Sequence, residues 1–337
     1  MALSSAPGKV YLFGEHAVVY GEPAVPCAIE RRATVEVTPR GDDRVRIEAE
    51  DLTLDGFTVE YSGSTEDRPD VDVPTPLVEA AMGYVDEALA QARDAIGDPD
   101  AGFDIRVDSD IPLGAGLGSS AAVVVAGIDA ATRAYGERLS PREIADRAYR
   151  AEYEVQDGQA SRADTFCSAV GGAVRVEGDD CRAIDAPQLP FVVGYDGGAG
   201  DTGELVAGVR ELKNAHEFAA DTVAAIGDVT RTGESLLADA DSAAPPSEAL
   251  LAELGELMDF NHGLLSALGV SARSLDSMVW AAREADAHGA KLTGAGGGGC
   301  VVALDPSPET ATGLRFTPGC EQAFRAELAT EGVNRVE

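Results

Sequence analysis

The sequence predicts an α+β protein built from two domains. A chain of 337 residues is long enough for two domains of ordinary size. Alternating, turn-bounded segments dominate its first half, whereas helical periodicity dominates the second half. No segment alternates strand and helix for long, which argues against a doubly wound parallel sheet. We therefore expect one domain over residues 1–185 and a second over residues 186–337.

Local patterns place the elements within these domains. Ser140 followed by Pro141 supplies an N-cap and a first-turn proline, as at the start of a helix. Strands are expected at residues 10–13, 24–29, 34–38, 44–50, 57–61, 103–107, 173–177 and 191–195 and on both sides of the glycine run 294–299, with irregular chain at 62–76 and 157–172. Helices are expected at residues 77–96, 119–135, 141–155, 203–214, 217–238, 247–268, 271–287 and near 319–330.

The charge of the chain is strongly negative. It holds 26 Lys and Arg against 59 Asp and Glu, a net charge of −33, and only three of the basic residues are lysines. The acidic residues are spread through a chain with ample apolar residues, so a disordered polyanion is excluded. Such a surface is typical of a cytosol with very high salt, where self-repulsion is screened. It repels nucleic acids and anionic membranes, and we expect neither as a partner.

Cysteines and apolar runs exclude several classes of protein. The five cysteines are scattered without a Cys-x-x-Cys pair, so neither a zinc site nor a disulfide framework is indicated. The first residues lack the pattern of a signal peptide, and no stretch reaches the roughly 18 apolar residues of a membrane helix. We therefore expect a cytoplasmic protein.

A glycine-rich loop within residues 112–126 is the most informative stretch of the sequence. It follows an expected strand, and its three alternate glycines lead into Ser119, Ser120 and a helix. Glycine lets the backbone approach a ligand closely, and a helix that begins at the serines directs free N–H groups into the turn. These features predict a phosphate-binding loop, with a plain glycine turn before a buried helix as the alternative. The loop matches neither a P-loop nor a dinucleotide fingerprint.

Four polar residues are candidates for chemistry. Lys9 lies on an expected strand, where a point charge can hold a phosphate or a carboxylate. Glu15 and His16 follow a glycine turn, from which side chains can project into a cleft. Asp164 lies in a half-buried stretch of small residues, where a carboxylate can act as a base or a metal ligand. The plainer alternatives are an exposed strand end for Lys9, a satisfied turn histidine for His16 and an Asx turn or helix cap for Asp164.

A second glycine run occupies residues 294–299. It formally matches Gly-x-Gly-x-x-Gly, but an expected strand follows it, which argues against a dinucleotide site. Glycines between two strands instead suggest a hairpin packed close to another backbone or a ligand, with a plain hairpin tip as the alternative.

Together and in this order, the three clusters resemble the GHMP family of small-molecule kinases over nearly the whole chain. Residues 112–122 match the signature Pro-x-Gly-x-Gly-Leu-Gly-Ser-Ser-Ala-x without a gap, and residues 291–300 match the third family motif. The resemblance implies an N-terminal domain of the ribosomal protein S5 domain 2 type and a C-terminal ferredoxin-like domain. ATP and substrate would lie in the cleft between them.

The resemblance also implies a role for each matching residue. Asp164 would accept the proton of the attacking hydroxyl, and Lys9 would keep that carboxylate ionised and stabilise the moving phosphoryl group. Ser120 and Glu152 would bind Mg²⁺, although an inserted residue before Ser161 leaves Glu154 as an alternative ligand. The ATP phosphates would be wrapped by Pro112, Leu113, Gly114, Ala115, Gly116, Leu117, Gly118, Ser119 and Ser120.

The substrate end of the cleft departs from the family in places. Glu15, His16 and Thr202 would contact the substrate. Gly203 stands where a lysine often follows the threonine, and Arg162 would compensate by holding a substrate carboxylate. Many members carry Ser-Gly-x-Asp-Asn around the aspartate, where this chain has Ser-Arg-Ala-Asp-Thr.

The stretch Gly-Glu-His-Ala-Val-Val-Tyr-Gly distinguishes between acceptors within the family. Galactokinases carry Thr-Asp where this chain has Ala17 and Val18, and homoserine kinases lack the Glu-His pair. The resemblance implies ATP-dependent phosphorylation of mevalonate to 5-phosphomevalonate in isoprenoid biosynthesis, with Mg²⁺. The alternatives are a kinase for another small hydroxy acid or a sugar, and a non-catalytic ATP-binding ligand sensor. A homodimer is left open, and the loop at residues 62–76 is the candidate adenine contact.

Overall fold

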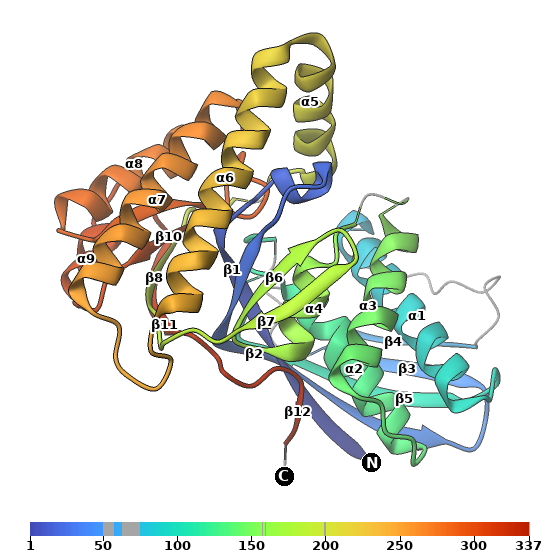
Figure 1. Cartoon of the computed structure of the whole chain (residues 1–337). Helices are drawn as coiled ribbons and strands as arrows, with labels where there is room; N and C mark the ends of the chain where they lie inside the picture. The colour runs from blue at the N-terminus through green and yellow to red at the C-terminus, as the bar shows by residue number, and fades with distance from the viewer. Residues whose placement is uncertain are drawn as a thin grey trace.

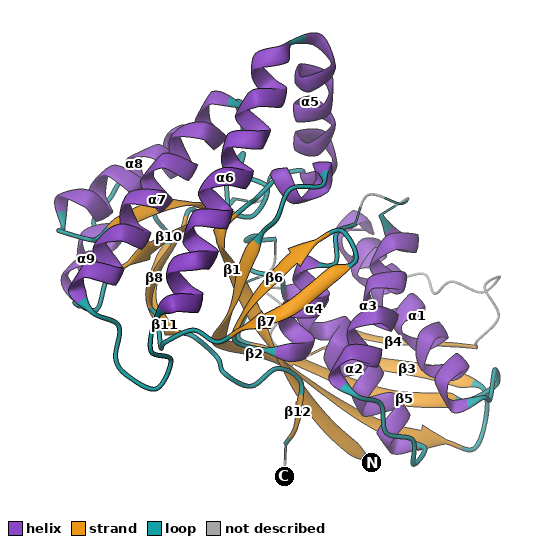
Figure 2. Cartoon of the chain, viewed as in Figure 1, coloured by secondary structure: helices purple, strands orange, loops and turns teal. Residues whose placement is uncertain are grey.

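The computed structural model describes residues 1–49, 57–62, 75–112, 114–156, 158, 160–198 and 200–336. Its strands form two sheets, and helices cover both of them (Figures 1 and 2). None of the helices in these ranges is long and apolar enough to span a bilayer.

The first sheet is built mainly from the N-terminal half of the chain. Its strands run in the order β12-β1-β2-β5-β3-β4, with β6 paired to β2 and β7 paired to β6. All of these pairs are antiparallel except β3 with β5, which confirms that the sheet is not doubly wound. The strands are β1 (Ala2–Phe13), β2 (Val25–Arg40), β3 (Arg44–Ala49), β4 (Phe57–Ser62), β5 (Gly102–Ser109), β6 (Ala173–Glu177), β7 (Asp180–Ile184) and β12 (Asn334–Arg335).

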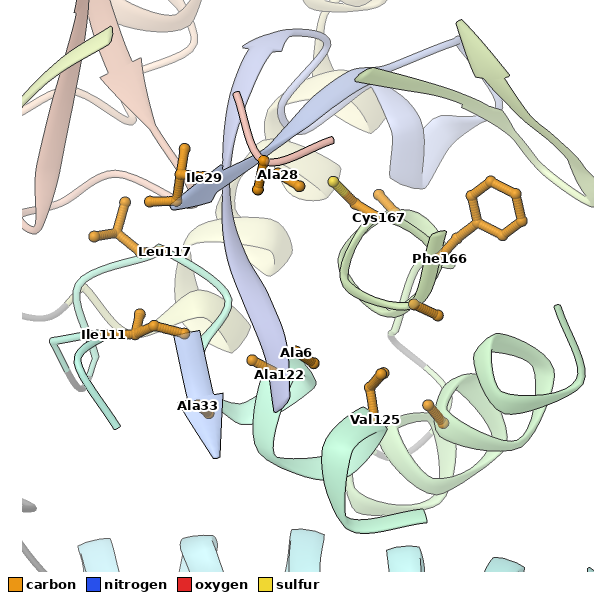
Figure 3. Packing of buried hydrophobic residues seen from close by; sticks show 14 of the residues in the cluster. Ala6, Ala28, Ile29, Ala33, Ile111, Leu117, Ala122, Val125, Phe166 and Cys167 are labelled. Carbon is orange, nitrogen blue, oxygen red and sulfur yellow. The ribbon is translucent and has the colours of Figure 1, made fainter. Parts of the chain in front are cut away.

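Four helices accompany this sheet: α1 (Thr75–Ile96), α2 (Ser119–Ala134), α3 (Pro141–Val155) and α4 (Ala163–Val170). The expected start of α3 is confirmed, because Ser140 and Glu143 form a capping box with Pro141 in the first turn. Small side chains let α2 lie close to the sheet, as Figure 3 shows where Ala122 faces Ala6 of β1. This packing fixes the first turn of α2 next to β1.

The second sheet has the order β11-β8-β10-β9 and is antiparallel throughout. Its strands are β8 (Pro190–Tyr195), β9 (Gly289–Thr293), β10 (Cys300–Leu304) and β11 (Gln322–Glu327). The helices of this part are η1 (Ala17–Tyr20, a 3₁₀ turn from the N-terminal region), α5 (Thr202–Ala215), α6 (Glu217–Asp239), α7 (Glu248–Ala267), α8 (Arg273–Glu284) and α9 (Glu309–Arg315). A second apolar cluster joins this sheet to these helices.

The chain passes from the first sheet to the second between β7 and β8. The passage lies at the expected domain division after residue 185, but the C-terminal strand β12 returns to pair with β1 (Figure 1). The division at residues 185 and 186 therefore stays a prediction. The two sheets also meet at the glycine loops described below.

Several elements differ from the sequence-based expectations. The expected helix near residues 319–330 is wrong, because this segment forms β11 on the edge of the second sheet. Pairing with β8 along all six of its residues overrides the helical preference of Ala and Glu. The expected irregular stretch contains α4, and β7 and α9 were not expected. Residues 63–74 of the candidate adenine loop lie outside the described ranges.

Candidate active site

Lys9 and Asp164 form the centre of the site. Alternate residues of β1 point to the same side, so Lys9 and Tyr11 share a face, while Asp164 lies in the first turn of α4. Lys9 Nζ lies 3.1 Å from Asp164 Oδ2. The Lys9 side chain is only 2% exposed, whereas that of Asp164 is 30% exposed. The ammonium is thus withdrawn from solvent, and one part of the carboxylate stays accessible to a ligand.

The first glycine loop wraps around Lys9. Lys9 Nζ donates a hydrogen bond to the Gly116 carbonyl oxygen at 2.9 Å, and the Lys9 backbone N–H donates to the Leu117 carbonyl at 2.8 Å. A Cβ atom on Gly118, whose φ is +74°, would lie 3.0 Å from the Lys9 side chain. Leu117 is buried beside Ile111 and anchors the loop (Figure 3). The expected convergence of Lys9, Asp164 and this loop is confirmed.

The loop leads directly into α2. This helix begins at Ser119 without a side-chain cap, so the N–H groups of its first turn are free to bind an anion. The Ser119 hydroxyl is buried and has no hydrogen-bond partner, and Ser120 is exposed. Leu113 of the predicted phosphate-binding residues lies outside the described ranges. The others, from Pro112 to Ser120, lie on this turn.

The second glycine run packs against the first loop. A Cβ atom on Gly294, whose φ is +86°, would lie 3.0 Å from Gly116 Cα, and one on Gly299 would lie 3.1 Å from the Ala115 carbonyl oxygen. The expected close approach to another backbone is therefore confirmed. Because β9 and β10 hold the ends of this run, the second sheet sets the position of the first loop.

Of the two candidate metal ligands on α3, Glu152 faces the site. Its side chain is 5% exposed, whereas Glu154 is exposed. Burial and the nearby charge of Asp164 raise the pKa of Glu152 to about 8, against a smaller opposing effect of Lys9. Two carboxylates in one water-poor region fit a divalent cation. Carboxylate oxygens are ligands that Mg²⁺ accepts, with phosphates and water in the rest of its shell.

Glu15 and His16 form a buried turn after β1. Glu15 is ion-paired with Lys291 of β9, and its Oε2 atom is buried without a partner. Burial raises the pKa of Glu15 and lowers the pKa of Lys291. His16 has a positive φ of 59°, its Nε2 lies 2.8 Å from the Ala295 carbonyl oxygen, and its Nδ1 is buried without a partner. Burial lowers the pKa of His16, so the ring is neutral near pH 7.

The remaining two predicted substrate contacts lie outside this cluster. The Arg162 guanidinium pairs with Asp146 at 2.6 Å and with Asp179 at 3.0 Å. These two ion pairs direct the guanidinium toward α3 and the turn between β6 and β7. Thr202 is an exposed residue at the start of α5, which Asp201 caps. This helix begins beside the second glycine run, because a Cβ atom on the preceding Gly200 would collide with the Gly296 carbonyl.

The structure adds residues to the site that were not expected from the sequence. Tyr11 donates from its hydroxyl to Asp164 Oδ1 at 2.8 Å, and its backbone N–H donates to Thr293 Oγ1 at 2.8 Å. Asn261 of α7 accepts a hydrogen bond from the Gly14 N–H at 3.2 Å, and its own Nδ2 is buried without a partner. Lys291 had a detectable signal, since it is one of only three lysines. Asn261 had none.

Family models match three parts of the chain. Residues 83–172 match the GHMP kinases N terminal domain, and residues 247–315 match the GHMP kinases C terminal model. Residues 2–39 match the galactokinase galactose-binding signature. The first glycine loop and the Lys9–Asp164 pair thus lie in a fold of the GHMP kinase class.

Relatives that align over nearly their whole length show which kinases of this class the chain is most similar to. The chain is 41% identical to the mevalonate kinase of Thermococcus sibiricus, with 99% of this chain and 98% of the relative covered. It is 42% identical to the mevalonate kinase of Pyrococcus horikoshii over 99% of this chain and 97% of that relative. The crystal structure of the Methanococcus jannaschii mevalonate kinase superposes with a TM-score of 0.78 at 28% identity, covering 97% and 98% of the two chains. The chain therefore belongs to the GHMP kinase family, among its mevalonate kinases.

Proposed function

We propose that this protein transfers the γ-phosphoryl group of ATP to the primary hydroxyl of mevalonate, forming 5-phosphomevalonate and ADP. The observation that carries the proposal is the position of one buried ammonium group. Lys9 Nζ contacts both the Asp164 carboxylate and the carbonyl of Gly116 in the glycine loop. A base for the acceptor hydroxyl and a cradle for the phosphates are thereby held a few ångströms apart.

The phosphate end of the site supports binding of the ATP tail. The first turn of α2 offers free N–H groups, and Lys9 adds a positive charge in a protein whose net charge is −33. Phosphoryl transfer depends mainly on positioning and charge neutralisation, which these groups supply. We propose that Ser120 and Glu152 hold Mg²⁺. When bound, this ion neutralises charge on the phosphate oxygens.

The acceptor end supports the chemical step. Asp164 would align the mevalonate hydroxyl and accept its proton as the oxygen bonds to the γ-phosphorus and the bond to the ADP oxygen breaks. Lys9 holds this carboxylate in place through the ion pair at 3.1 Å. Glu15, His16 and Thr202 are proposed substrate contacts, and the unpartnered Oε2 and Nδ1 atoms of the first two are the groups that a polar substrate could satisfy.

A sugar acceptor is the second candidate, because the galactokinase galactose-binding signature matches residues 2–39. ADP release in high salt with mevalonate, phosphomevalonate, pantoate, homoserine and galactose distinguishes the two. We expect mevalonate to give the highest kcat/KM. Faster turnover of galactose or of another member of the panel would replace the proposal, and no turnover with any of them despite tight ATP binding would indicate a ligand sensor. We propose the cytoplasm as the setting, and a homodimer stays a proposal that sedimentation can test.

Replacement of the proposed base tests the mechanism. Asp164→Asn keeps the size of the side chain but cannot accept the proton, and we expect kcat to fall by about 10²–10⁴-fold. Asp179→Asn is the matched control, since Asp179 is an exposed partner of Arg162, and its kcat is expected within twofold of wild type. An Asp164→Asn enzyme within threefold of wild type would remove Asp164 from the mechanism.

A further inference from the structure

We propose that Tyr11 is a positioning residue that holds the proposed base in its working orientation, an inference that rests on the proposed function of Asp164. The Tyr11 hydroxyl donates to Asp164 Oδ1 at 2.8 Å, while Lys9 Nζ lies 3.1 Å from Oδ2. Both oxygens are thus held by residues of one strand face. A carboxylate fixed at both oxygens cannot rotate about its Cβ–Cγ bond without losing a partner.

Tyr11 is itself held firmly in place. It is 6% exposed, and its backbone N–H donates to Thr293 Oγ1 of β9. The Lys9 ammonium lies 4.4 Å from the centre of the Tyr11 ring, a cation–π contact. Strand register, burial and two polar contacts therefore determine where the hydroxyl points. A support of this kind is what keeps a functional carboxylate within a few tenths of an ångström of its required position.

The chemistry of the hydroxyl suits a donor rather than a base. Burial and the charge of Asp164 raise the pKa of Tyr11 well above its usual value, so the hydroxyl keeps its proton at working pH. A neutral donor stabilises the charged carboxylate and does not compete for the substrate proton. In the proposed reaction that proton moves from the acceptor hydroxyl to Asp164, and the Tyr11 proton stays on its own oxygen.

The hydrogen bond of Tyr11 acts among several other groups that face Asp164. Lys9 of β1 forms an ion pair with Asp164, and Glu152 of α3, Tyr84 of α1 and Cys167 of α4 are close enough to interact with its charge. Lys9 is the cation of this set and Glu152 is a second acid. Removal of the Tyr11 hydroxyl leaves Asp164 Oδ1 without this hydrogen bond, so the Lys9 ion pair at Oδ2 alone no longer fixes the orientation of the carboxylate.

Tyr11→Phe isolates the hydroxyl, because the ring and its contact with Lys9 remain. We expect kcat to fall about tenfold, as for one charge-assisted hydrogen bond, with the KM for ATP within twofold of wild type. Tyr135→Phe is the matched control. It also removes one hydrogen bond of 2.8 Å, which Tyr135, at the C-terminal end of α2, donates to the Gly102 carbonyl oxygen. A kcat for Tyr11→Phe equal to that for Tyr135→Phe would overturn the proposal.

A double-mutant cycle separates positioning of the base from loss of stability. If Tyr11 acts through Asp164, Tyr11→Phe costs about tenfold in the wild-type background and less than twofold in Asp164→Asn. An equal cost in both backgrounds would show a merely structural role. The rates are measured with whichever acceptor the wild type phosphorylates fastest. If mevalonate is not the substrate, the wild-type enzyme will prefer another acceptor. The cycle still tests Tyr11 in that case, so the two proposals can fail separately.

The contact itself can be tested without turnover. A buried tyrosine hydroxyl bonded to a carboxylate should give a slowly exchanging proton signal in tyrosine-labelled protein. We expect this signal to vanish in Tyr11→Phe, to shift in Asp164→Asn and to persist in Tyr135→Phe. A signal that Asp164→Asn leaves unmoved would contradict the proposed pairing, even if the variant enzymes were unstable.

Discussion

Lys291 and Glu15 form a buried ion pair between β9 and the turn after β1. Lys291 also donates to the Leu292 carbonyl oxygen at 2.7 Å. Removing two charges from water is costly, and their attraction offsets this cost only while both partners are present. The pair therefore contributes more to the position of the turn that carries His16 than to net stability.

The first prediction concerns this pair. Lys291→Met leaves the Glu15 carboxylate buried without a cation, and we expect a loss of about 3–5 kcal/mol in the free energy of unfolding, measured with urea in high salt. The double variant Glu15→Gln, Lys291→Met should regain much of this loss. Lys213→Met, which removes a lysine that packs on the Tyr20 ring, is the control and should cost less than about 1 kcal/mol. Equal losses in the single and double variants would contradict the prediction.

The second prediction concerns Glu152, whose pKa is raised from 4.5 to about 8. The folded protein then holds a proton that the unfolded chain releases, so its stability falls as the pH rises through that interval. Glu152→Gln removes this dependence. Without Mg²⁺ and nucleotide, we expect the Tm of the variant at pH 8.5 to exceed that of wild type by about 4 °C or more, and the difference to vanish near pH 5.

The exposed neighbour supplies the control for Glu152. Glu154→Gln should follow the wild-type Tm at every pH. If Glu152 also binds Mg²⁺, the ion with nucleotide should stabilise wild type more than Glu152→Gln, and the variant should lose most of its activity. If Glu154→Gln instead behaves as expected for Glu152→Gln, then Glu154 is the metal ligand and not Glu152.

At the level of residues, the sequence singles out side chains that are unusual in their surroundings, and the structure brings two of them, Lys9 and Asp164, into contact. Lys9 was detectable because the chain has almost no lysine, and Asp164 because it follows small residues and precedes glycines. Tyr11 was missed, because a tyrosine on a strand is typical of a core residue. Its partners lie 153 and 282 residues away, and only the folded chain brings them together.

At the scale of elements, the two glycine turns act as one unit. Gly116 and Gly294 face each other backbone to backbone, and a side chain on either would separate the loops. This contact transmits the position of the β9–β10 hairpin to the start of α2. The need for this close contact explains the glycines at positions 116 and 294. Turn formation alone is a weaker explanation.

The third prediction follows from this contact. Gly294→Ala must accept both a positive φ and a Cβ atom 3.0 Å from Gly116 Cα. We expect the KM for ATP to rise about tenfold, because the phosphate loop is displaced, together with a stability loss above the about 1–2 kcal/mol of the strained φ. Gly136→Ala is the control, because its φ of +91° is similar and nothing lies within 4 Å of the added methyl. If both variants bind ATP alike, the contact is unimportant.

Prediction of elements failed where pairing or burial was decided by distant residues. α4 begins at Ala163, its N-cap Arg162 makes no side-chain capping bond, and it has only eight residues, so its sequence lacks the usual signals of a helix. β11 carries alanine and glutamate, which favour helix, and becomes a strand through its partner β8. In contrast, α3 was predicted well, because its capping box lies entirely within local sequence.

At the scale of the whole molecule, β1 connects the two sheets, and β2 also contacts β11 of the second sheet. It pairs with β2 and with the C-terminal β12, and Tyr11 reaches Thr293 of the second sheet. Gly14, just beyond its end, is held by Asn261 of α7. The proposed base, phosphate loop and substrate turn are therefore all attached to one strand, so a relative shift of the sheets would disturb all three together.

The last prediction concerns the charge of the whole chain. The acidic residues behind the net charge of −33 repel one another across the surface. The Debye screening length falls from about 10 Å at 0.1 M salt to about 3 Å at 1 M, so salt weakens this repulsion. We expect the Tm to rise by about 5–10 °C between 0.1 and 2 M KCl, which corresponds to a few kcal/mol for a chain of this size.

A neutral cosolute distinguishes screening from preferential exclusion. Sucrose at matched water activity strengthens burial without screening charge, so it should reproduce only part of the shift. The Lys9 ammonium is only 2% exposed and is therefore shielded from salt, so kcat should depend less on KCl than the Tm does. A Tm that stays constant between 0.1 and 2 M KCl would contradict adaptation to high salt and leave the acidic surface without this explanation.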